Sequence, residues 1–308
     1  MSSSPTIDNN IVIGIDLGTN NTCFAVLSEQ LEIIANPLGE RLTPSFVHID
    51  DEDVIIGSPA TKAAIRHPER VIFAVKRLIG RFYDDPNFQK DLQNIPYKVI
   101  NRDNIPIIVI ENDKNEVEYY KAEDIYAKIL TYVKTTVSDY IGANITNVVI
   151  TVPANFTILQ RNATKYAAKL AGLNVVHILN EPTAAAFAYG YQSLLRNKDK
   201  ERILIYDFGG GTLDVSIVIS DHGILTVLGS CGDTHLGGVD FDNIIIDYAK
   251  NDFTQQTNGK IFDDNNPFAT VSLRNACRDA KITLSSSTTA YIPITSCGEE
   301  VVVTRKRG

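Results

Sequence analysis

Residues 203–219 contain two apolar runs joined by a short glycine-rich turn (ILIYDFGGGTLDVSIVI). The runs predict two strands, and the turn is bounded by Asp207, Thr212 and Asp214. Successive glycines permit positive φ and bring backbone N–H groups close to a ligand, which suits phosphate oxygens. Carboxylates beside a phosphate repel it unless a hard cation such as Mg²⁺ lies between them. The alternative interpretation is a plain β-hairpin with a flexible tip. The turn glycines are Gly209, Gly210 and Gly211.

The same pattern occurs near the start of the chain. An apolar run ends in Asp16 and a second begins at Cys23, and the turn between them contains Gly18, Thr19 and Asn20. In both copies a glycine lies two residues beyond the aspartate. One such hairpin is weak evidence for a ligand site, whereas two copies indicate an internal duplication into two lobes. A nucleoside triphosphate clamped between the lobes would fit this pair of turns.

The rest of the chain alternates predicted strands and helices, as in an α/β protein. A third glycine-rich turn is predicted at 232–238. The predicted helices are 60–65, 122–141, 157–171, 184–189, 271–284 and one from about 241, and the predicted strands are 31–36, 45–49, 148–152, 175–179, 225–229, 290–294 and 301–304.

The expected organisation is a disordered polar leader at 1–10, lobe I at 11–195 and lobe II at 196–308. The highly charged loop at the start of lobe II, which ends near Arg202, is the predicted boundary. Within lobe I, about residues 45–120 form an inserted subdomain, because the second part of this stretch alternates apolar and polar residues as antiparallel strands do.

The run 73–81 places Lys76, Arg77 and Arg81 among apolar residues. One interpretation is a helix whose basic residues are solvated. The other is that one of these cations reaches an anionic ligand. The pattern alone leaves both open.

Composition excludes several classes of function. The net charge of −8 argues against general nucleic-acid binding, and no apolar run approaches the roughly 20 residues of a membrane-spanning helix. The four cysteines are scattered and lack metal-ligand spacing, which predicts reduced thiols and a cytoplasmic location. P-loop, Rossmann, zinc-binding and serine-hydrolase patterns are missing from the sequence.

The motifs that remain resemble the ATPase domain of the seventy-kilodalton heat-shock (DnaK-like) chaperones. They occur in the order of that family and span nearly the whole chain. The resemblance implies an α/β, actin-like ATPase fold with two ribonuclease H-like lobes around a nucleotide cleft, the second lobe being incomplete. The matching stretches are IGIDLGT at 13–19, VKRLIGR at 75–81, ITVPA at 150–154, NEPTAAA at 180–186, DFGGGTLD at 207–214 and GDTHLGG at 232–238.

The resemblance also implies roles for single residues in ATP hydrolysis. Asp16 and Asp207 would hold Mg²⁺, mainly through water, and Glu181 would assist. Lys76 would orient the attacking water and offset charge on the terminal phosphate. Thr212 and Asp214 would position that water.

ATP or ADP would be held by further residues implied by the same resemblance, with K⁺ as an additional candidate ion. Pro153 and Arg161 match a pair that relays the nucleotide state to the rest of the chaperone. The implied nucleotide contacts are Gly18, Thr19, Asn20, Gly209, Gly210, Gly211 and Gly238, with Lys281 and Ser285 at the nucleoside.

Two positions at the nucleoside depart from the family pattern. Arg278 stands where the family usually has glutamate, and Ile282 stands where it usually has arginine. A ribose acceptor and a planar cation that can stack on the base are therefore lost. Asp279 offers a carboxylate, but it lies one residue along the helix, about 100° away.

The partners implied by the resemblance are J-domain co-chaperones and nucleotide-exchange factors. Asn155, Ile158 and His177 replace family residues near the relay and the coupling positions. Unfolded polypeptide would bind only through a domain that this sequence does not contain. The family continues beyond Gly308, so the sheet of lobe II is expected to lack strands and to expose an edge or an apolar face.

Three functions remain open on the sequence alone. The leading one is the nucleotide-binding part of an ATP-hydrolysing chaperone. The second is a non-hydrolysing member of the same family that binds nucleotide weakly and acts through protein contacts. The third, a sugar or acid kinase of the same fold, is disfavoured by the long match at 232–238.

Overall fold

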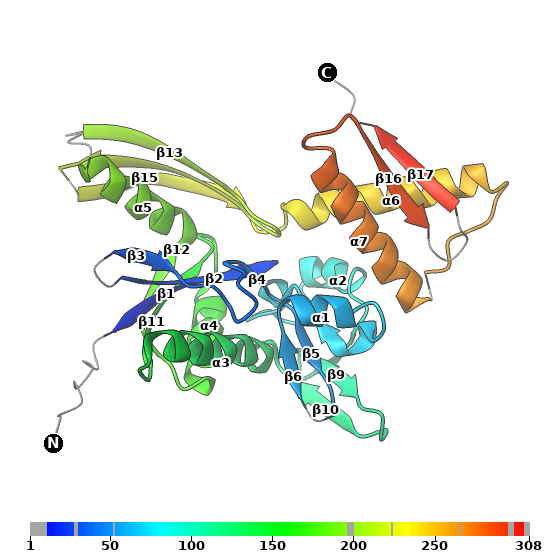
Figure 1. The fold of residues 1–308 in the computed structure, drawn as a ribbon, viewed down its shortest axis with the longest axis horizontal. Helices are drawn as coiled ribbons and strands as arrows, with labels where there is room; N and C mark the ends of the chain where they lie inside the picture. Colours follow the sequence, from blue (N-terminus) through cyan, green and yellow to red (C-terminus); the bar gives the residue numbers. More distant parts are fainter. Residues whose placement is uncertain are drawn as a thin grey trace.

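The computed structural model describes residues 11–27, 30–51, 53–195, 200–222, 224–264, 266–294 and 299–304. The predicted leader and the first part of the predicted boundary loop, residues 196–199, lie outside these ranges. Figure 1 shows the chain as a lower body, made by lobe I, with two separate units of lobe II standing above it.

A six-stranded sheet forms the centre of lobe I. Its strands β1, β11 and β12 run parallel, and β2 is antiparallel to β1. Along β1, Ile13, Ile15 and Leu17 are buried while the residues between them are exposed, as period-two alternation requires. The strands in sheet order are β12 (Asn174–Asn180), β11 (Asn147–Val152), β1 (Val12–Leu17), β2 (Asn21–Leu27) and β3 (Leu31–Ile33), with β4 (Thr43–Pro44) paired to β2.

Two helices cover one face of this sheet. They are α3 (Ala122–Ile141) and α4 (Ile158–Leu170), which lie side by side beneath it in Figure 1. The predicted helix register in α3 is confirmed, because Ile125, Ile129 and Val133 are fully buried in the main core. Gly142 ends α3 in the left-handed region, at φ 73°.

The predicted subdomain contains two small antiparallel sheets and short helices. Its second sheet follows the predicted alternation at 99–120. The strands of the first sheet are β6 (Val54–Ile56), β5 (Val47–Ile49) and β7 (Val71–Ile72), and those of the second are β10 (Val117–Tyr120), β9 (Ile105–Glu111) and β8 (Lys98–Arg102). The helices are α1 (Ser58–Ala63), α2 (Pro86–Leu92) and the 3₁₀ turns η1 (Pro68–Arg70) and η2 (Val75–Arg77).

The first unit of lobe II is a three-stranded antiparallel sheet, and the last helix of lobe I covers one of its faces. The helix is α5 (Glu181–Leu195), and its Ala186 packs against Ile203 and Val218. The opposite face carries exposed apolar side chains, including Leu204 and Tyr206 at 65% and 64% exposure, so the predicted apolar face is confirmed. The strands are β13 (Lys200–Phe208), β14 (Leu213–Asp221) and β15 (Ile224–Asp233).

The second unit of lobe II has a core of its own, built around Phe253 and Leu273. It touches the inserted subdomain where Val271 packs against Ala64 and Val71. Its elements are α6 (Gly238–Gln256), α7 (Pro267–Thr283), β16 (Thr289–Ile294) and β17 (Glu299–Thr304).

The structure differs from the sequence-based expectations at three places. The run 73–81 is not a helix with solvated cations, because only η2 forms there and both Lys76 and Arg77 are buried. Helix α2 was not predicted, although Asp85 caps it and Pro86 occupies its first turn. The third glycine-rich turn starts later than expected, because β15 continues through Asp233.

Free thiols occur at three described cysteines, Cys23, Cys231 and Cys277. Burial raises the pKa of Cys277 to about 12, which keeps that thiol protonated. Among the described residues, no helix has both the length and the apolar content needed to span a membrane.

Candidate functional site

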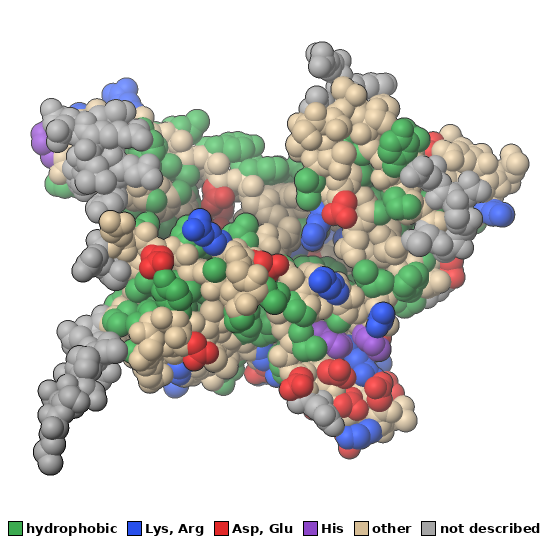
Figure 2. Space-filling model, in the orientation of Figure 1, with side chains coloured by type: hydrophobic (Ala, Val, Ile, Leu, Met, Phe, Trp, Pro, Cys, Tyr) green, Lys and Arg blue, Asp and Glu red, His purple; other side chains and the backbone are tan. Residues whose placement is uncertain are grey.

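A cavity of about 680 Å³ lies between the two lobes, beside the first unit of lobe II. Figure 2 shows the hollow between the upper sheet and the lower body, with acidic side chains on its wall. The cavity brings together most of the residues predicted for the phosphate end. Its lining includes Asp16, Gly18, Thr19, Asn20, Lys76, Glu181, Asp207, Gly209, Gly210 and Thr212.

The two predicted hairpins face each other across this cavity and close in the same way. In the first, the N–H of Gly18 donates to the carbonyl of Asn21 at 3.1 Å. In the second, the N–H of Gly209 donates to the carbonyl of Thr212 at 2.9 Å. The repeated bond supports the internal duplication predicted from the sequence.

The turn glycines are needed for close approach and not for positive φ. None of Gly209, Gly210 and Gly211 has positive φ, so that expectation is wrong. A Cβ on Gly210 would lie 2.5 Å from the side-chain amide of Asn20, and one on Gly211 would lie 3.0 Å from Oγ1 of Thr19. The second turn therefore presents bare backbone to the first.

Lys76 reaches the cavity because of an unusual backbone conformation just before it. Ala74 has φ 53°, in the left-handed region, and η2 then directs the lysine inward. Its Nζ lies 2.5 Å from Oε1 of Glu181, and the lysine is only 6% exposed. The interpretation that a cation of this run faces the cavity is therefore the one that the geometry favours.

Two acidic side chains of the cavity, Glu181 and Asp207, have a raised pKa. Burial raises the pKa of Glu181 to about 7, against the opposing effect of Lys76 and with help from Asp16 and Asp207. Burial and the charge of Asp16 also raise the pKa of Asp207. Asp16 itself accepts a hydrogen bond from Oγ1 of Thr151 at 3.1 Å. One lysine among three carboxylates leaves the cavity acidic, which favours a bound cation.

A glutamine at position 181 should flatten part of the pH dependence of stability. A carboxyl whose folded pKa is raised from 4.5 to about 7 contributes stability that is complete below pH 4.5 and is lost as the pH rises through 7. Between pH 4.5 and pH 7 the free energy of unfolding of the wild type should therefore fall by about 1–3 kcal/mol more than that of Glu181→Gln. Urea unfolding at pH 5 and pH 7.5 measures both slopes, and Asp139→Asn, at an exposed position on α3, serves as control. Equal slopes in wild type and Glu181→Gln would contradict the assignment.

Asp214 lies behind the cavity, directly opposite Asp207 in the pairing of β13 with β14. It is buried, which raises the pKa of its carboxyl, and it accepts a hydrogen bond from the N–H of Ala154 at 3.3 Å. This bond joins the second hairpin to the segment that contains Pro153. Arg161 holds the same segment, donating to the carbonyls of Pro153, Ala154 and Phe156 and to Oδ1 of Asn180, the neighbour of Glu181.

The residues predicted at the nucleoside lie apart from this cavity. Lys281 donates to the carbonyl of Gly238 at 2.8 Å and pairs with the buried Asp242 at 2.6 Å. Ser285 follows the end of α7, and Ile282 is 59% exposed. Lys281 and Gly238 are thus in contact with each other, while neither lines the cavity with Lys76.

Sequence reasoning missed two kinds of site residue. Ala184, Ala185 and Ala188 line the cavity, and their small size lets α5 border it closely. The alanine-rich composition of this helix signalled close packing but not its location. The second kind is represented by Arg77, whose side chain points away from the cavity and pairs with Asp240 of lobe II.

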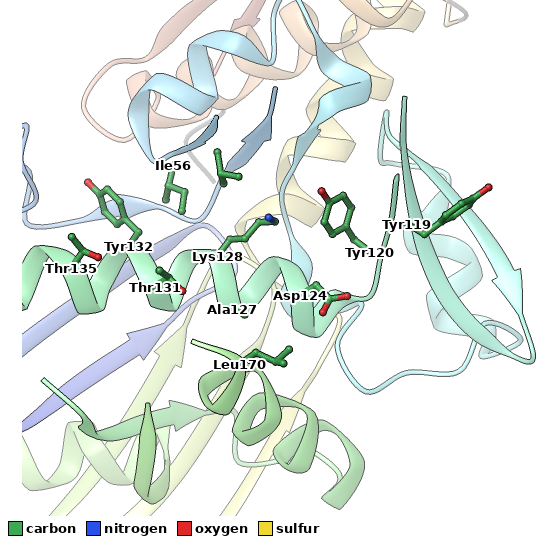
Figure 3. A pocket seen from close by; sticks show the side chains of 11 residues that line it. Ile56, Tyr119, Tyr120, Asp124, Ala127, Lys128, Thr131, Tyr132, Thr135 and Leu170 are labelled. Atoms are coloured by element: carbon green, nitrogen blue, oxygen red, sulfur yellow. The ribbon is translucent and has the colours of Figure 1, made fainter. Parts of the chain in front are cut away.

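Another cavity, of about 810 Å³, lies in lobe I between α3, β6 and β10. Figure 3 shows tyrosines and aliphatic side chains around it, with Lys128 beside Tyr120. Asp124 there accepts from the N–H of Lys121 at the start of α3. Because it lacks a convergent set of carboxylates or glycine turns, this larger cavity is not the candidate site.

An acidic cluster on the surface is also a poor candidate. Among the described residues, Asp50, Asp51 and Asp113 form the group whose oxygens all lie within 4.8 Å of one another. Arg70 already pairs with all three. Among the described residues, Asp16 and Asp207 do not belong to a group of three such ligands.

Comparison with known proteins gives consistent similarities. The model of the Hsp70 protein family matches residues 12–307. The chain is 42% identical over 290 residues to "Heat shock 70 kDa protein 2" of Paracoccidioides lutzii and 43% identical over 290 residues to "Heat shock 70 kDa protein" of Neurospora crassa. Each of these alignments covers 94% of the chain and 44% of the relative. It is also 43% identical over 284 residues to a ribosome-associated molecular chaperone of Zygosaccharomyces rouxii, covering 92% of the chain and 46% of the relative. The chain thus spans less than half the length of these relatives.

Proposed function

The chain belongs to the Hsp70 family, and from this premise we propose that it is the nucleotide-binding part of a chaperone that hydrolyses Mg-ATP to drive protein folding cycles. Members of this family are ATPases with an actin-like ATPase fold, which confirms the predicted fold class. Mg-ATP would bind between lobe I and lobe II. We place the protein in the cytoplasm, in keeping with its free thiols.

The observation that carries the proposal is the meeting of two Asp-Gly hairpins from different lobes around one lysine and three carboxylates. Backbone N–H groups in such turns bind phosphate oxygens, and glycine at Gly210 and Gly211 lets this turn lie close to the side chains of Asn20 and Thr19. The acidic side chains then need a cation before a polyanion can enter. These requirements describe a nucleotide bound together with a metal ion.

The donor set fits Mg²⁺. Asp16, Glu181 and Asp207 offer hard carboxylate oxygens, and burial, with a further contribution from the neighbouring carboxylates, raises the pKa of Glu181 and of Asp207. When bound, the ion would supply charge neutralisation on the phosphates. Asp16 and Asp207 would hold it, mainly through water, and Glu181 would share its charge with Lys76.

The chain's own residues would then position the reaction. Lys76 would orient the attacking water and offset the charge that develops on the terminal phosphate. Thr212 lies at the cavity and Asp214 behind it, so the hydroxyl and the carboxylate would order that water between them. The nucleotide contacts proposed from the family pattern are Gly18, Thr19, Asn20, Gly209, Gly210, Gly211, Gly238, Lys281 and Ser285.

The proposal includes a series of hydrogen bonds that leads from this site toward the proteins that would bind the chain. Asp214 binds the N–H of Ala154, and Arg161 clamps the same segment to Asn180. A change at the phosphate end would therefore move the segment after Pro153. J-domain co-chaperones and nucleotide-exchange factors are proposed as the proteins that use this coupling, and unfolded polypeptide as the substrate of the whole chaperone.

The non-hydrolysing alternative is favoured by one observation at the nucleoside end. Lys281 is engaged by Asp242 and Gly238, and Ile282 offers no cation to a base. Weak nucleotide affinity would follow from these contacts. A kinase of the same fold is excluded from the proposal by the family match over residues 12–307.

Nucleotide binding and turnover test the proposal directly. Wild-type chain should bind ATP and ADP in a Mg²⁺-dependent way and release phosphate, whereas Asp16→Asn/Asp207→Asn should lose the Mg²⁺ dependence and at least about 100-fold in turnover. Isothermal titration and single-turnover phosphate release measure the two quantities. Asp221→Asn, at a surface position at the end of β14, should match wild type. Binding without turnover would favour the non-hydrolysing alternative, and no binding at all would contradict the proposal.

A further inference from the structure

Arg77 lies next to Lys76 but contacts a different part of the molecule. Its Nη1 is 3.0 Å from Oδ1 of Asp91, in α2 of lobe I. Its Nη2 is 2.8 Å from Oδ2 of Asp240, in α6 of lobe II, and 3.4 Å from the carbonyl oxygen of Gly211. The arginine is only 8% exposed. A buried guanidinium that pairs with a carboxylate of each lobe holds the two lobes at a fixed distance.

The partners on lobe II are themselves tied to the second hairpin. Asp240 also accepts the N–H of Gly237 at 2.7 Å at the start of α6. From the same helix end, Gly238 and Val239 donate their N–H groups to the carbonyls of Gly209 and Gly210, at 3.0 and 2.8 Å. Arg77 therefore holds the glycine turn twice, through Gly211 directly and through the start of α6.

Asp91 extends this connection to a second point on lobe II. Its Oδ2 lies 3.2 Å from Nε2 of His235, in the third glycine-rich turn. Across the part of the chain that the structure describes, the ion pair between the lobes that involves no histidine is the one of Arg77 with Asp240. Two further hydrogen bonds between the lobes lie elsewhere: Arg274 of α7 donates to the carbonyl of Asn94, and the N–H of Ala154 donates to Asp214 behind the cavity.

We propose that Arg77 is a positioning residue that latches lobe II onto lobe I and thereby sets how fast bound nucleotide leaves the cleft. Closure of the lobes by Arg77 and Asp240 follows from the geometry alone. The effect on nucleotide release rests on the proposed function. Arg77 is buried and Asp240 is partly buried, so removing one of them leaves the other charge unpaired and weakens the closed arrangement more than the loss of a fully exposed pair would.

We call the ion pair of Arg77 with Asp240 the latch. The variants that remove it are Arg77→Gln and Asp240→Asn. The asparagine keeps the shape of the side chain and an oxygen for the N–H of Gly237. Arg81→Gln is the matched control, because Arg81 lies in the same run and pairs at 2.8 Å with Asp85, also in lobe I. The double variant Arg77→Gln/Asp240→Asn tests whether the two residues act through each other.

Closure is measured without nucleotide, by the distance between spin labels on Lys90→Cys in α2 and Asn251→Cys in α6, both exposed positions. Cys23, Cys231 and Cys297 are replaced by serine, and the buried Cys277 is left in place. The distance distribution should broaden in Arg77→Gln and in Asp240→Asn, with no further broadening in the double variant. It should stay unchanged in Arg81→Gln. Unchanged distributions in both latch variants, or equal broadening in the control, would overturn the proposal.

Release is measured with a fluorescent ADP analogue in the chain with its native cysteines. Both latch variants should release it about 10- to 100-fold faster than wild type and Arg81→Gln, while the hydrolysis rate of bound ATP in a single turnover changes much less. A merely structural defect would instead lower both rates and the unfolding midpoint. If wild type does not bind the analogue, the proposed function fails, and the distance measurement still decides the latch. Unaltered release in both variants would contradict the role of Arg77 in nucleotide exit.

Discussion

Lys76→Ala is expected to slow ATP hydrolysis by about 10²- to 10³-fold while nucleotide still binds. The lysine is the only cation among the residues that line the cavity, and it lies beside Glu181, Asp16 and Asp207. In the proposed mechanism the lysine offsets charge on the terminal phosphate in the transition state, so the lost interaction would belong to the transition state more than to the bound ground state. The turns that are proposed to bind the phosphates would do so through backbone N–H groups and do not depend on this side chain.

Single-turnover rates and ADP affinity, measured on the same preparation, separate these effects. A fall in turnover with affinity within a few-fold of wild type indicates loss of an interaction specific to the transition state. Arg81→Ala serves as control for the removal of a cation from the same run. Turnover of Lys76→Ala equal to that of wild type would remove the lysine from the catalytic set. Restoration of turnover in Lys76→Ala/Glu181→Gln would show instead that the defect came from unpaired charge on Glu181.

The phosphate end of the site could be predicted from the sequence because its chemistry is local. Each hairpin carries its aspartate, glycines and hydroxyl within a few residues, so a periodicity of two and a turn place them without knowledge of the fold. Gly18 and Gly209 even close their turns with the same bond. The relation between the two hairpins followed from their repetition, which indicated two lobes.

Other features depend on contacts between distant segments and could not be predicted from local pattern. The sequence at 73–81 is compatible with a helix. In the structure Ala74 instead adopts the left-handed region, and after it Lys76 points into the cavity whereas Arg77 points toward lobe II. Positive φ was a reasonable expectation for three glycines in a row, yet Gly210 and Gly211 are required by the proximity of Asn20 and Thr19, from the other hairpin. The partners of Arg77 in lobe II, Gly211 and Asp240, are more than a hundred residues away in the sequence.

A methyl group at position 237 is expected to separate the second hairpin from α6. A Cβ on Gly237 would lie 2.4 Å from the N of Gly211 and 2.5 Å from the carbonyl carbon of Gly210, and both are backbone atoms that cannot rotate aside. The strain does not come from φ, which is −165° and open to any residue. Relief requires the turn to move, which breaks the bonds from Gly238 and Val239. Overpacking and two lost hydrogen bonds together should cost about 3 kcal/mol or more.

Gly229→Ala is the matched substitution, because Gly229 lies in β15 of the same lobe and a Cβ there would meet nothing within 4 Å. It should leave stability within about 1 kcal/mol of wild type. Urea unfolding and ADP titration of both variants measure the difference. Gly237→Ala should lose nucleotide affinity more than stability alone accounts for, since the displaced turn carries the N–H groups proposed to bind phosphate. Wild-type affinity in Gly237→Ala would show that the turn and the start of α6 are not held together in solution as the structure has them, and the latch formed by Arg77 and Asp240 would then have nothing to position.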